Sequence, residues 1–256
     1  MQPLLVIDDL QEFPDARISV GQIAVLAAVH FLVLQRLQER FASGAVIAMS
    51  YSEPSLAPEF TLALASWARP AGVDIVWKTN GFVNQSVLER LVQPLTAVNL
   101  DLKASSDRSH FKLTGAPLQP VLSTLRYLAA SHVWLEVSTP VIPGVNDDSE
   151  SLEQIAELVV GAGAQIPWHL LRFTPEYRMG NFCPTHPDKL AEAVRIAKRV
   201  GLKYVYVERA LGPAGRNTVC PSCKATIITR GVWTLDVDSL SSGHCPECGF
   251  RIPGHW

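Results

Sequence analysis

Short apolar runs rich in β-branched residues alternate, along most of the chain, with longer segments in which apolar residues recur at helical spacing. Six short runs are typical of strands and cover residues 45–51, 73–79, 97–103, 133–142, 167–173 and 203–208. Five longer segments have the period of amphipathic helices and cover residues 58–71, 85–95, 118–131, 149–162 and 187–200. Strands joined by crossover helices form parallel sheets, and near-continuous apolar strands are buried on both faces. The pattern therefore predicts an α/β fold over residues 45–212, in which a TIM-like (β/α) barrel or partial barrel is favoured over an open, half-exposed sheet.

The segment before this barrel, residues 1–44, has a different pattern and contains one long apolar helix, predicted over Val20–Phe41. Its most apolar run, residues 23–34, is too short to span a bilayer core of roughly 30 Å, so a buried helix is favoured over a membrane anchor. This helix could cover the exposed edge of the first strand or drive formation of a homodimer. The run at residues 4–8 fits a further strand, but the pattern does not decide the point.

Four of the five cysteines form two Cys-x-x-Cys pairs separated by 21 residues, and the predicted metal ligands are Cys220, Cys223, Cys245 and Cys248. Four thiolates at this spacing predict one tetrahedral zinc ion. Residues 225–237 between the pairs are β-rich, with a turn at residues 230–231. We interpret residues 213–256 as a small zinc ribbon that follows a linker rich in glycine and proline. A closed four-thiolate site has no open position for substrate, which makes the zinc structural.

The charge and composition of the chain argue against nucleic acid and membranes as partners. The formal net charge is −2 and charged residues make up 18% of the chain, so no basic surface for nucleic acid is expected. The N-terminal residues are acidic rather than basic, which argues against a secretory leader and against two disulfides in place of a metal. We therefore expect a cytoplasmic protein that does not act on nucleic acid or in a membrane.

Polar residues stand at the ends of the predicted strands, in the loops that follow, or within the strand at 167–173; in a parallel α/β fold these loops share one face. They are Glu53, Thr79, Asn80, Asp101, Lys103, Asn146, His169 and Arg172. A carboxylate such as Glu53 could hold a ligand ammonium group, whereas Thr79 and Lys103 could hold a carboxylate or ribose hydroxyls. The Pro143–Gly144 turn lets backbone approach a ring of adenine size. The competing interpretation of Glu53 is a helix cap or a solvated side chain.

Several blocks of residues carry a family resemblance in order along the chain: SYSEPS, WKTNGF, NLDLKA, WLEVSTPVIPGVNDDSESL, PWHLLRFTPEYRM and CPSC…CPECGFRIPGHW. From about Ala45 onward the chain resembles the radical SAM enzymes of the AmmeMemoRadiSam type, which are similar to pyruvate formate-lyase activating enzymes. The resemblance implies a partial barrel that binds S-adenosylmethionine at its strand ends and carries a C-terminal zinc-ribbon-like tail. It also implies reductive cleavage of S-adenosylmethionine to a 5′-deoxyadenosyl radical that acts on an unknown protein or small-molecule substrate. Memo-like and AMMECR-like proteins are companions by the same analogy.

The resemblance also assigns cofactor-binding positions, which are Glu53, Thr79, Asn80, Asp101, Lys103, Val141, Pro143, Asn146, His169 and Arg172. By that resemblance Glu53 contacts the amino group of S-adenosylmethionine, and Thr79, Asn80 and Lys103 contact its carboxylate or ribose. The turn from Val141 to Asn146 meets the adenine. Asp101 and Arg172 face the substrate or the sulfonium. No catalytic residue is assigned.

Members of the family carry a Cys-x-x-x-Cys-x-x-Cys loop that holds a four-iron, four-sulfur cluster. This sequence has no cysteine before Cys183. Cys183, His186 and His169 could chelate a metal, but unrelated loop residues are the plainer interpretation. Three interpretations stay open: the cluster half lies upstream of this sequence, or the chain is a cluster-free protein that binds S-adenosylmethionine, or it is a scaffold whose ribbon docks a partner.

Overall fold

The computed structural model describes residues 46–50 and 52–256, and its largest feature is a six-stranded parallel sheet. The strands are β1 (Val46–Met49), β2 (Asp74–Thr79), β3 (Ala97–Asp101), β4 (Trp134–Val141), β5 (Trp168–Arg172) and β6 (Val205–Val207). They lie side by side in sequence order, and each pair of neighbours is parallel. All six predicted strands are confirmed, and so is the α/β class with a partial barrel.

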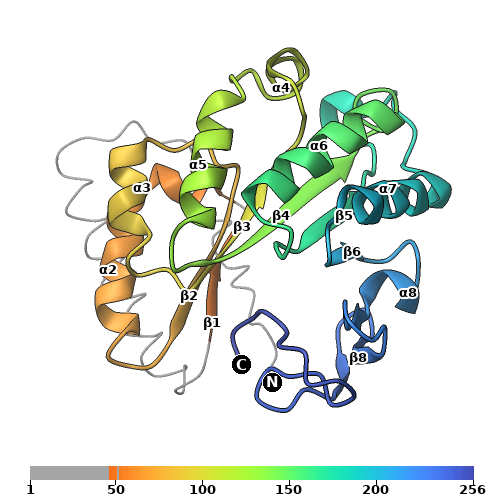
Figure 1. Cartoon of the computed structure of the whole chain (residues 1–256). Coiled ribbons are helices and arrows are strands. Elements are labelled where there is room, and N and C mark those ends of the chain that lie inside the picture. Colours follow the sequence, from red (N-terminus) through yellow and green to blue (C-terminus); the bar gives the residue numbers. More distant parts are fainter. Residues whose placement is uncertain (1–45, 51) are drawn as a thin grey trace.

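Helices follow the strands and pack together on one side of the curved sheet (Figure 1). They are α2 (Pro58–Ala68), α3 (Gln85–Leu91), α5 (Gln119–Ala129), α6 (Ser149–Ala162) and α7 (Pro187–Val200), as the apolar periodicity predicts. The short helix α4 (Asp107–Thr114) was not predicted, because its sequence is mostly polar. The residues at its two ends cap the helix. The Ser106 hydroxyl accepts the N–H of Ser109 at 3.2 Å, and Gly115 is the C-cap with φ 75°.

Alternation along the strands divides the sheet into two different faces. Trp77, Leu100, Val137 and Trp168 point toward the helices and are at most 1% exposed. Their neighbours in sequence point to the opposite side, which we call the inner face. Within the described residues this inner face is half-buried and largely polar, whereas the apolar sequence pattern predicted burial on both faces. The core therefore lies between the sheet and its helices.

The four-cysteine segment forms a separate three-stranded antiparallel sheet, of β7 (Thr218–Val219), β8 (Thr226–Arg230) and β9 (Leu235–Asp238). Its small core contains two of the cysteines, three isoleucines and Tyr204, which immediately precedes β6. The short helix α8 (Pro213–Arg216) also lies against β6, since a Cβ added to Gly215 would meet the carbonyl oxygen of Val207 at 2.7 Å. The ribbon is thus packed against β6, the edge strand of the parallel sheet (Figure 1).

The helix predicted over Val20–Phe41, with its covering or dimerising role, and the strand considered at residues 4–8 lie outside the described residues. Among the helices that the structure does describe, none is both long and apolar enough to cross a membrane.

Candidate functional site

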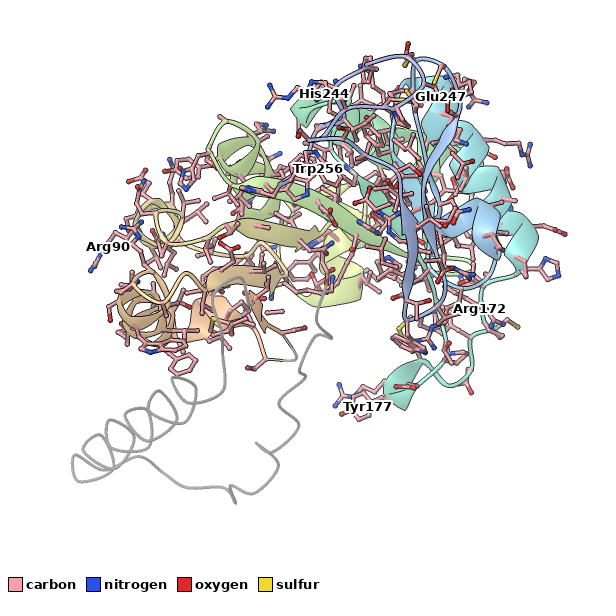
Figure 2. All side chains as sticks on the ribbon, turned by 90° about the horizontal axis from the view of Figure 1, so that it is seen from below. Arg90, Arg172, Tyr177, His244, Glu247 and Trp256 are labelled. Carbon is pink, nitrogen blue, oxygen red and sulfur yellow. The ribbon has the colours of Figure 1, made fainter. Side chains whose placement is uncertain are left out.

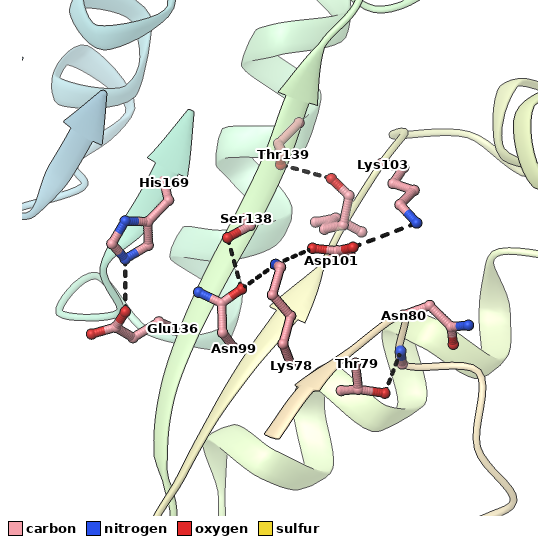
Figure 3. A network of polar contacts seen from close by, with 12 residues as sticks. Lys78, Thr79, Asn80, Asn99, Asp101, Lys103, Glu136, Ser138, Thr139 and His169 are labelled. Carbon is pink, nitrogen blue, oxygen red and sulfur yellow. Dashed lines mark hydrogen bonds and ion pairs between the residues drawn. The ribbon is translucent and has the colours of Figure 1, made fainter. Parts of the chain in front are cut away.

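The inner face carries two rows of polar side chains that the strand register brings together (Figure 3). One row runs across three strands and consists of Lys78, Asn99 and Glu136. The next row, one step closer to the carboxyl ends of the strands, consists of Asp101, Ser138, His169 and Tyr206. Polar groups that converge on one face of a parallel sheet, at the carboxyl ends of its strands, form the usual ligand site of this architecture.

Two lysines share one carboxylate at the ends of β2 and β3. Lys78 Nζ lies 2.6 Å from Asp101 Oδ1 and 2.8 Å from Asn99 Oδ1, and Lys103 Nζ lies 3.5 Å from Asp101 Oδ2. All three charged groups are partly exposed, with 41%, 20% and 31% of the Lys78, Asp101 and Lys103 side chains accessible. Two ammonium groups around one carboxylate leave a net positive charge that can attract an anion.

Glu53 joins the loops after β1 and β2. Its Oε1 accepts the Thr79 hydroxyl at 2.6 Å and the N–H of Ser55 at 3.2 Å, and its Oε2 accepts the N–H of Asn80 at 2.8 Å. The hydrogen bond from Ser55 makes Glu53 the N-cap of the short helix η1 (Pro54–Leu56). Glu53 therefore has the capping role considered from the sequence and also forms hydrogen bonds to the end of β2. Because Oε2 accepts one bond, it retains capacity for a further donor.

The turn after β4 is built around a buried amide. Asn146 is 1% exposed; its Nδ2 donates to the carbonyls of Lys103 and Pro140, both at 2.9 Å, and its Oδ1 accepts the N–H of Ile142 at 2.6 Å. The Asn146 side chain therefore fastens β4 to the end of β3. Val141 is fully buried, and Pro143 begins the turn in which Gly144 adopts φ 71°. Of the predicted adenine-facing positions, the structure leaves the backbone around Pro143 accessible but not the side chains of Val141 and Asn146.

Glu136 and His169 form an acid–imidazole pair on the same face. Glu136 Oε2 lies 2.7 Å from His169 Nε2, and Glu136 Oε1 accepts the indole N–H of Trp134 at 3.0 Å. Burial opposes ionisation of Glu136, but the hydrogen bond and charge of His169, with smaller effects of Trp134 and Arg230, together outweigh burial and lower the pKa of Glu136. The carboxylate can only accept, so His169 Nε2 carries the proton of this bond and Nδ1 takes no part in it.

Arg172 is not brought to the inner face. It follows His169 by three residues, so the alternation of the strand turns it to the other side, where its Nε donates to the carbonyl of Thr185 at 3.2 Å. Nor does the structure gather Cys183, His186 and His169: Cys183 is exposed, His186 caps α7, and His169 pairs with Glu136.

The ribbon cysteines, in contrast, converge. The four sulfur atoms lie within 4.8 Å of one another, with Cys220–Cys248 at 3.7 Å and Cys223–Cys245 at 3.6 Å. Thiolates bound to one tetrahedral zinc ion at ~2.3 Å lie ~3.8 Å apart, so the four sulfurs fit such an ion. Within the described part of the chain, no other group of three or more histidine, cysteine or acidic ligands is close enough to hold a metal.

The two knuckles share one backbone conformation. The N–H of Cys220 donates to the carbonyl of Ala225, and the N–H of Cys245 donates to the carbonyl of Phe250, at 2.8 and 2.9 Å. The N–H of Phe250 lowers the pKa of the Cys248 thiol to about 7. At Cys223 the N–H of Ala225 also acts to lower the pKa, but burial and the neighbouring sulfurs oppose a further negative charge and raise the pKa of this thiol to about 12. A bound cation would compensate that charge.

Comparison with known proteins decides the family. The family model for the radical SAM superfamily matches residues 32–159, which is half of the chain. The chain belongs to the radical SAM superfamily. It is 34% identical over 209 residues to an uncharacterized protein of Methanocaldococcus jannaschii, a match that covers 80% of this chain and 62% of that protein. It is 32% identical over 151 residues to the isethionate sulfite-lyase activating enzyme of Oleidesulfovibrio alaskensis, covering 58% and 47% of the two chains.

The match to the pyruvate formate-lyase 1-activating enzyme of Escherichia coli K12 is 26% identical over 178 residues and covers 64% of this chain and 72% of that enzyme. The chain spans about half to two thirds of the length of the first two relatives. Among solved structures, a domain of a pyruvate-formate lyase-activating enzyme from Bacteroides vulgatus aligns with TM-score 0.55 at 19% identity, covering 64% of this chain and 99% of that one. A radical SAM methyltransferase from Sphaerobacter thermophilus aligns with TM-score 0.53 at 20% identity, covering 73% and 57%. These structural likenesses show the shared fold.

The second knuckle lies away from the loop that follows β5. Figure 2 shows Tyr177, on that loop, on the opposite side of the molecule from His244, which precedes the second knuckle, and Glu247, which lies within it. The family implies S-adenosylmethionine and an iron–sulfur cluster, but this sequence offers no second set of cysteines for the cluster.

The polar residues of the inner face that were not predicted from the sequence include Lys78, Asn99, Glu136 and Ser138. They lie inside strands, whereas most of the predicted positions lie at strand ends or in the loops that follow. Their signal was present: each interrupts an apolar run at every second position, as in WKT, NLDLK and WLEVS. Such alternation marks a face that is not packed in the core.

Proposed function

We propose that the chain binds S-adenosylmethionine at the inner-face site. The chemistry of its lineage is reductive cleavage of this molecule to a 5′-deoxyadenosyl radical that acts on an unknown protein or small-molecule substrate; the alternative is a cluster-free protein that binds S-adenosylmethionine or serves as a scaffold. The observation that carries the proposal is the juxtaposition of an anionic and a cationic group at neighbouring strand ends. Glu53 holds the end of β2, and the Lys78–Asp101–Lys103 cluster lies at the ends of β2 and β3. An amino acid needs both signs of charge to be recognised.

The residues present fit the amino-acid end of S-adenosylmethionine. Glu53 is a carboxylate that still accepts, suited to an ammonium group, and Lys103 is a partly exposed cation suited to a carboxylate. When bound, S-adenosylmethionine would supply a sulfonium for reductive cleavage. The chain's own residues bind and orient it: Thr79 and Asn80 keep the Glu53 loop in place, and Asp101 holds the two ammonium groups.

The residues do not fit an iron–sulfur cluster. No cysteine precedes Cys183, and the four ribbon cysteines already surround one another. The cluster that the family uses is therefore not assigned to any residue of this sequence. Iron and acid-labile sulfide measured per chain after anaerobic reconstitution test this point, and a near-stoichiometric cluster on this chain alone would contradict it.

We further propose that the ribbon holds zinc and that the protein is of the AmmeMemoRadiSam type, with Memo-like and AMMECR-like companions. The thiolate geometry and the paired knuckles support zinc over oxygen-loving cations. Metal analysis of the purified protein tests the identity, with about one zinc per chain expected for a single four-thiolate site. Cytoplasmic location stays a prediction.

Calorimetric titration of S-adenosylmethionine into the metal-loaded chain tests the binding proposal. Glu53→Gln and Lys103→Met should each weaken binding about tenfold or more, because each removes a hydrogen bond to a charged group. The matched controls are Glu59→Gln and Lys112→Met, exposed residues of α2 and α4 away from the site. Binding that is undetectable in the unaltered chain, or that all four variants leave unchanged, would overturn the proposal.

A further inference from the structure

A continuous set of side-chain contacts connects the inner face of the barrel with the ribbon. It begins at Glu136 on β4, passes through His169 on β5 and Tyr206 on β6, and ends at Arg230 on β8. The first three members come from three neighbouring strands of the parallel sheet, and the last belongs to the ribbon sheet. The ribbon therefore contributes to the wall of the site proposed above for S-adenosylmethionine and substrate, and the inference below rests on that proposed function.

Tyr206 is the member that links the two sheets. Its ring is stacked on the His169 imidazole, with centroids 5.4 Å apart and planes inclined by 26°. Its hydroxyl lies 2.9 Å from Thr218 Oγ1 on β7, the first strand of the ribbon. Burial raises the pKa of Tyr206, so it stays a neutral phenol that can stack on the imidazole and hydrogen-bond to the ribbon at once.

Arg230 holds Tyr206 from the ribbon side. Its guanidinium carbon lies 5.6 Å from the centre of the Tyr206 ring, within cation–π range. Its Nη1 donates to Thr218 Oγ1 at 2.7 Å and to the carbonyl of Arg216 at 3.0 Å. The Arg230 main-chain carbonyl in turn accepts Nε of Arg216 at 3.1 Å. Arg230 is thus fixed at both its backbone and its side chain, and its charge is directed to the Tyr206 ring.

The charge of Arg230 also reaches the far end of the set. Together with His169, it is one of the positive groups that lower the pKa of Glu136, and the Glu136 charge in turn adds to the effect of burial in raising the pKa of Tyr206. The first knuckle joins β7 to β8. Thr218 and Val219 of β7 lead directly into Cys220, whose N–H donates to the carbonyl of Ala225, the residue before β8.

We propose that Arg230 and Tyr206 are positioning residues through which the four-cysteine ribbon fixes the orientation of the His169 imidazole, with its Nε2 directed at Glu136. The ribbon is then a part of the ligand site's wall. Arg230 is directed at the ring that stacks on His169, so the ribbon reaches the Glu136–His169 pair through one intervening residue.

The test is nitrogen NMR of the histidine side chains in the metal-loaded chain, with the His169 signals assigned from a His169→Gln variant. In the unaltered chain Nε2 should carry the proton shared with Glu136. In Arg230→Met we expect the two His169 nitrogens to move toward tautomer averaging and, by carbon NMR, the pKa of Glu136 to rise. Arg251→Met is the matched control, since Arg251 is an exposed arginine of the same ribbon.

Tyr206 provides a second test that leaves the ribbon sequence intact. Tyr206→Leu should change the His169 signals as Arg230→Met does, whereas Tyr206→Phe keeps the stack and should retain most of the wild-type tautomer. Metal content per chain should stay the same in all variants. Unchanged His169 signals in both Arg230→Met and Tyr206→Leu, or equal changes in Arg251→Met, would overturn the proposal. Because no S-adenosylmethionine is added, the outcome is separate from that of the binding experiment.

Discussion

Lys78 reaches diagonally across the sheet to Asp101. The strand register places Lys78 directly opposite Asn99, yet its ammonium lies 2.6 Å from Asp101 Oδ1, two residues farther along β3. This reach brings the charge of Lys78 to the last residue of β3, where Lys103 shares the same carboxylate. A single replacement at Lys78 therefore removes the surplus positive charge of the cluster.

Lys78→Met should weaken binding of S-adenosylmethionine about tenfold and flatten its dependence on salt, since the remaining Lys103–Asp101 pair is neutral overall. The free energy of unfolding should change by less than about 1 kcal/mol, because the pair is partly exposed. Titration calorimetry at two ionic strengths measures the first effect, and urea denaturation the second. Lys112→Met should change neither. An unfolding penalty with unaltered binding would assign Lys78 a purely structural role.

Cys220→Ser should abolish metal binding by the ribbon, because the remaining three thiolates leave the tetrahedral site incomplete and Cys220 is fully buried in the ribbon core. We expect metal per chain to fall close to zero and protease to cut within residues 213–256 while the barrel stays folded. Cys183→Ser is the control, as Cys183 is exposed and outside the sulfur cluster, and it should retain full metal content.

Lys224→Gly should make the first knuckle more stable. Lys224 adopts φ 67°, the conformation that Gly249 adopts with φ 72° at the equivalent position of the second knuckle. A side chain costs roughly 1 kcal/mol there, and glycine does not. Resistance of the bound metal to a chelator should therefore rise. Lys224→Ala keeps the Cβ and serves as the control; if it stabilises as much as glycine does, backbone strain is not the cause.

The sequence predicts the elements of this fold well because the helix-facing residues, such as Trp77 and Leu100, repeat at the period of a strand. It predicts the metal ligands because their spacing is itself the signal. The Lys78–Asp101 and Glu136–His169 pairs depend on which residues stand opposite each other in neighbouring strands, and no local pattern contains that register. At Asn146 the sequence position suggests a ligand contact, but the fold uses the side chain differently. Its amide forms hydrogen bonds with main-chain groups that only the fold brings near.

Asp148→Ala should destabilise the protein by about 1 kcal/mol, because Asp148 caps α6 with bonds from the N–H and hydroxyl of Ser151 at 2.8 and 2.7 Å. The N–H of Ser151 is the main cause of the lowered pKa of Asp148. The charge-dependent stabilisation is therefore complete above the pKa of the unfolded chain, about 3.9, and is lost as pH falls through the lower pKa of the folded state.

Urea denaturation at pH 7 and at pH 3 distinguishes the cap from a general effect of charge. The difference between the unaltered chain and Asp148→Ala should be larger at pH 7 than at pH 3, where the carboxyl group begins to be protonated. Asp148→Asn should retain part of the cap at both values, since its amide oxygen still accepts. Glu157→Gln, an exposed change on the same helix, should show neither effect. A difference that stays the same at both pH values would mean that the cap works through shape and hydrogen bonding alone, without its charge.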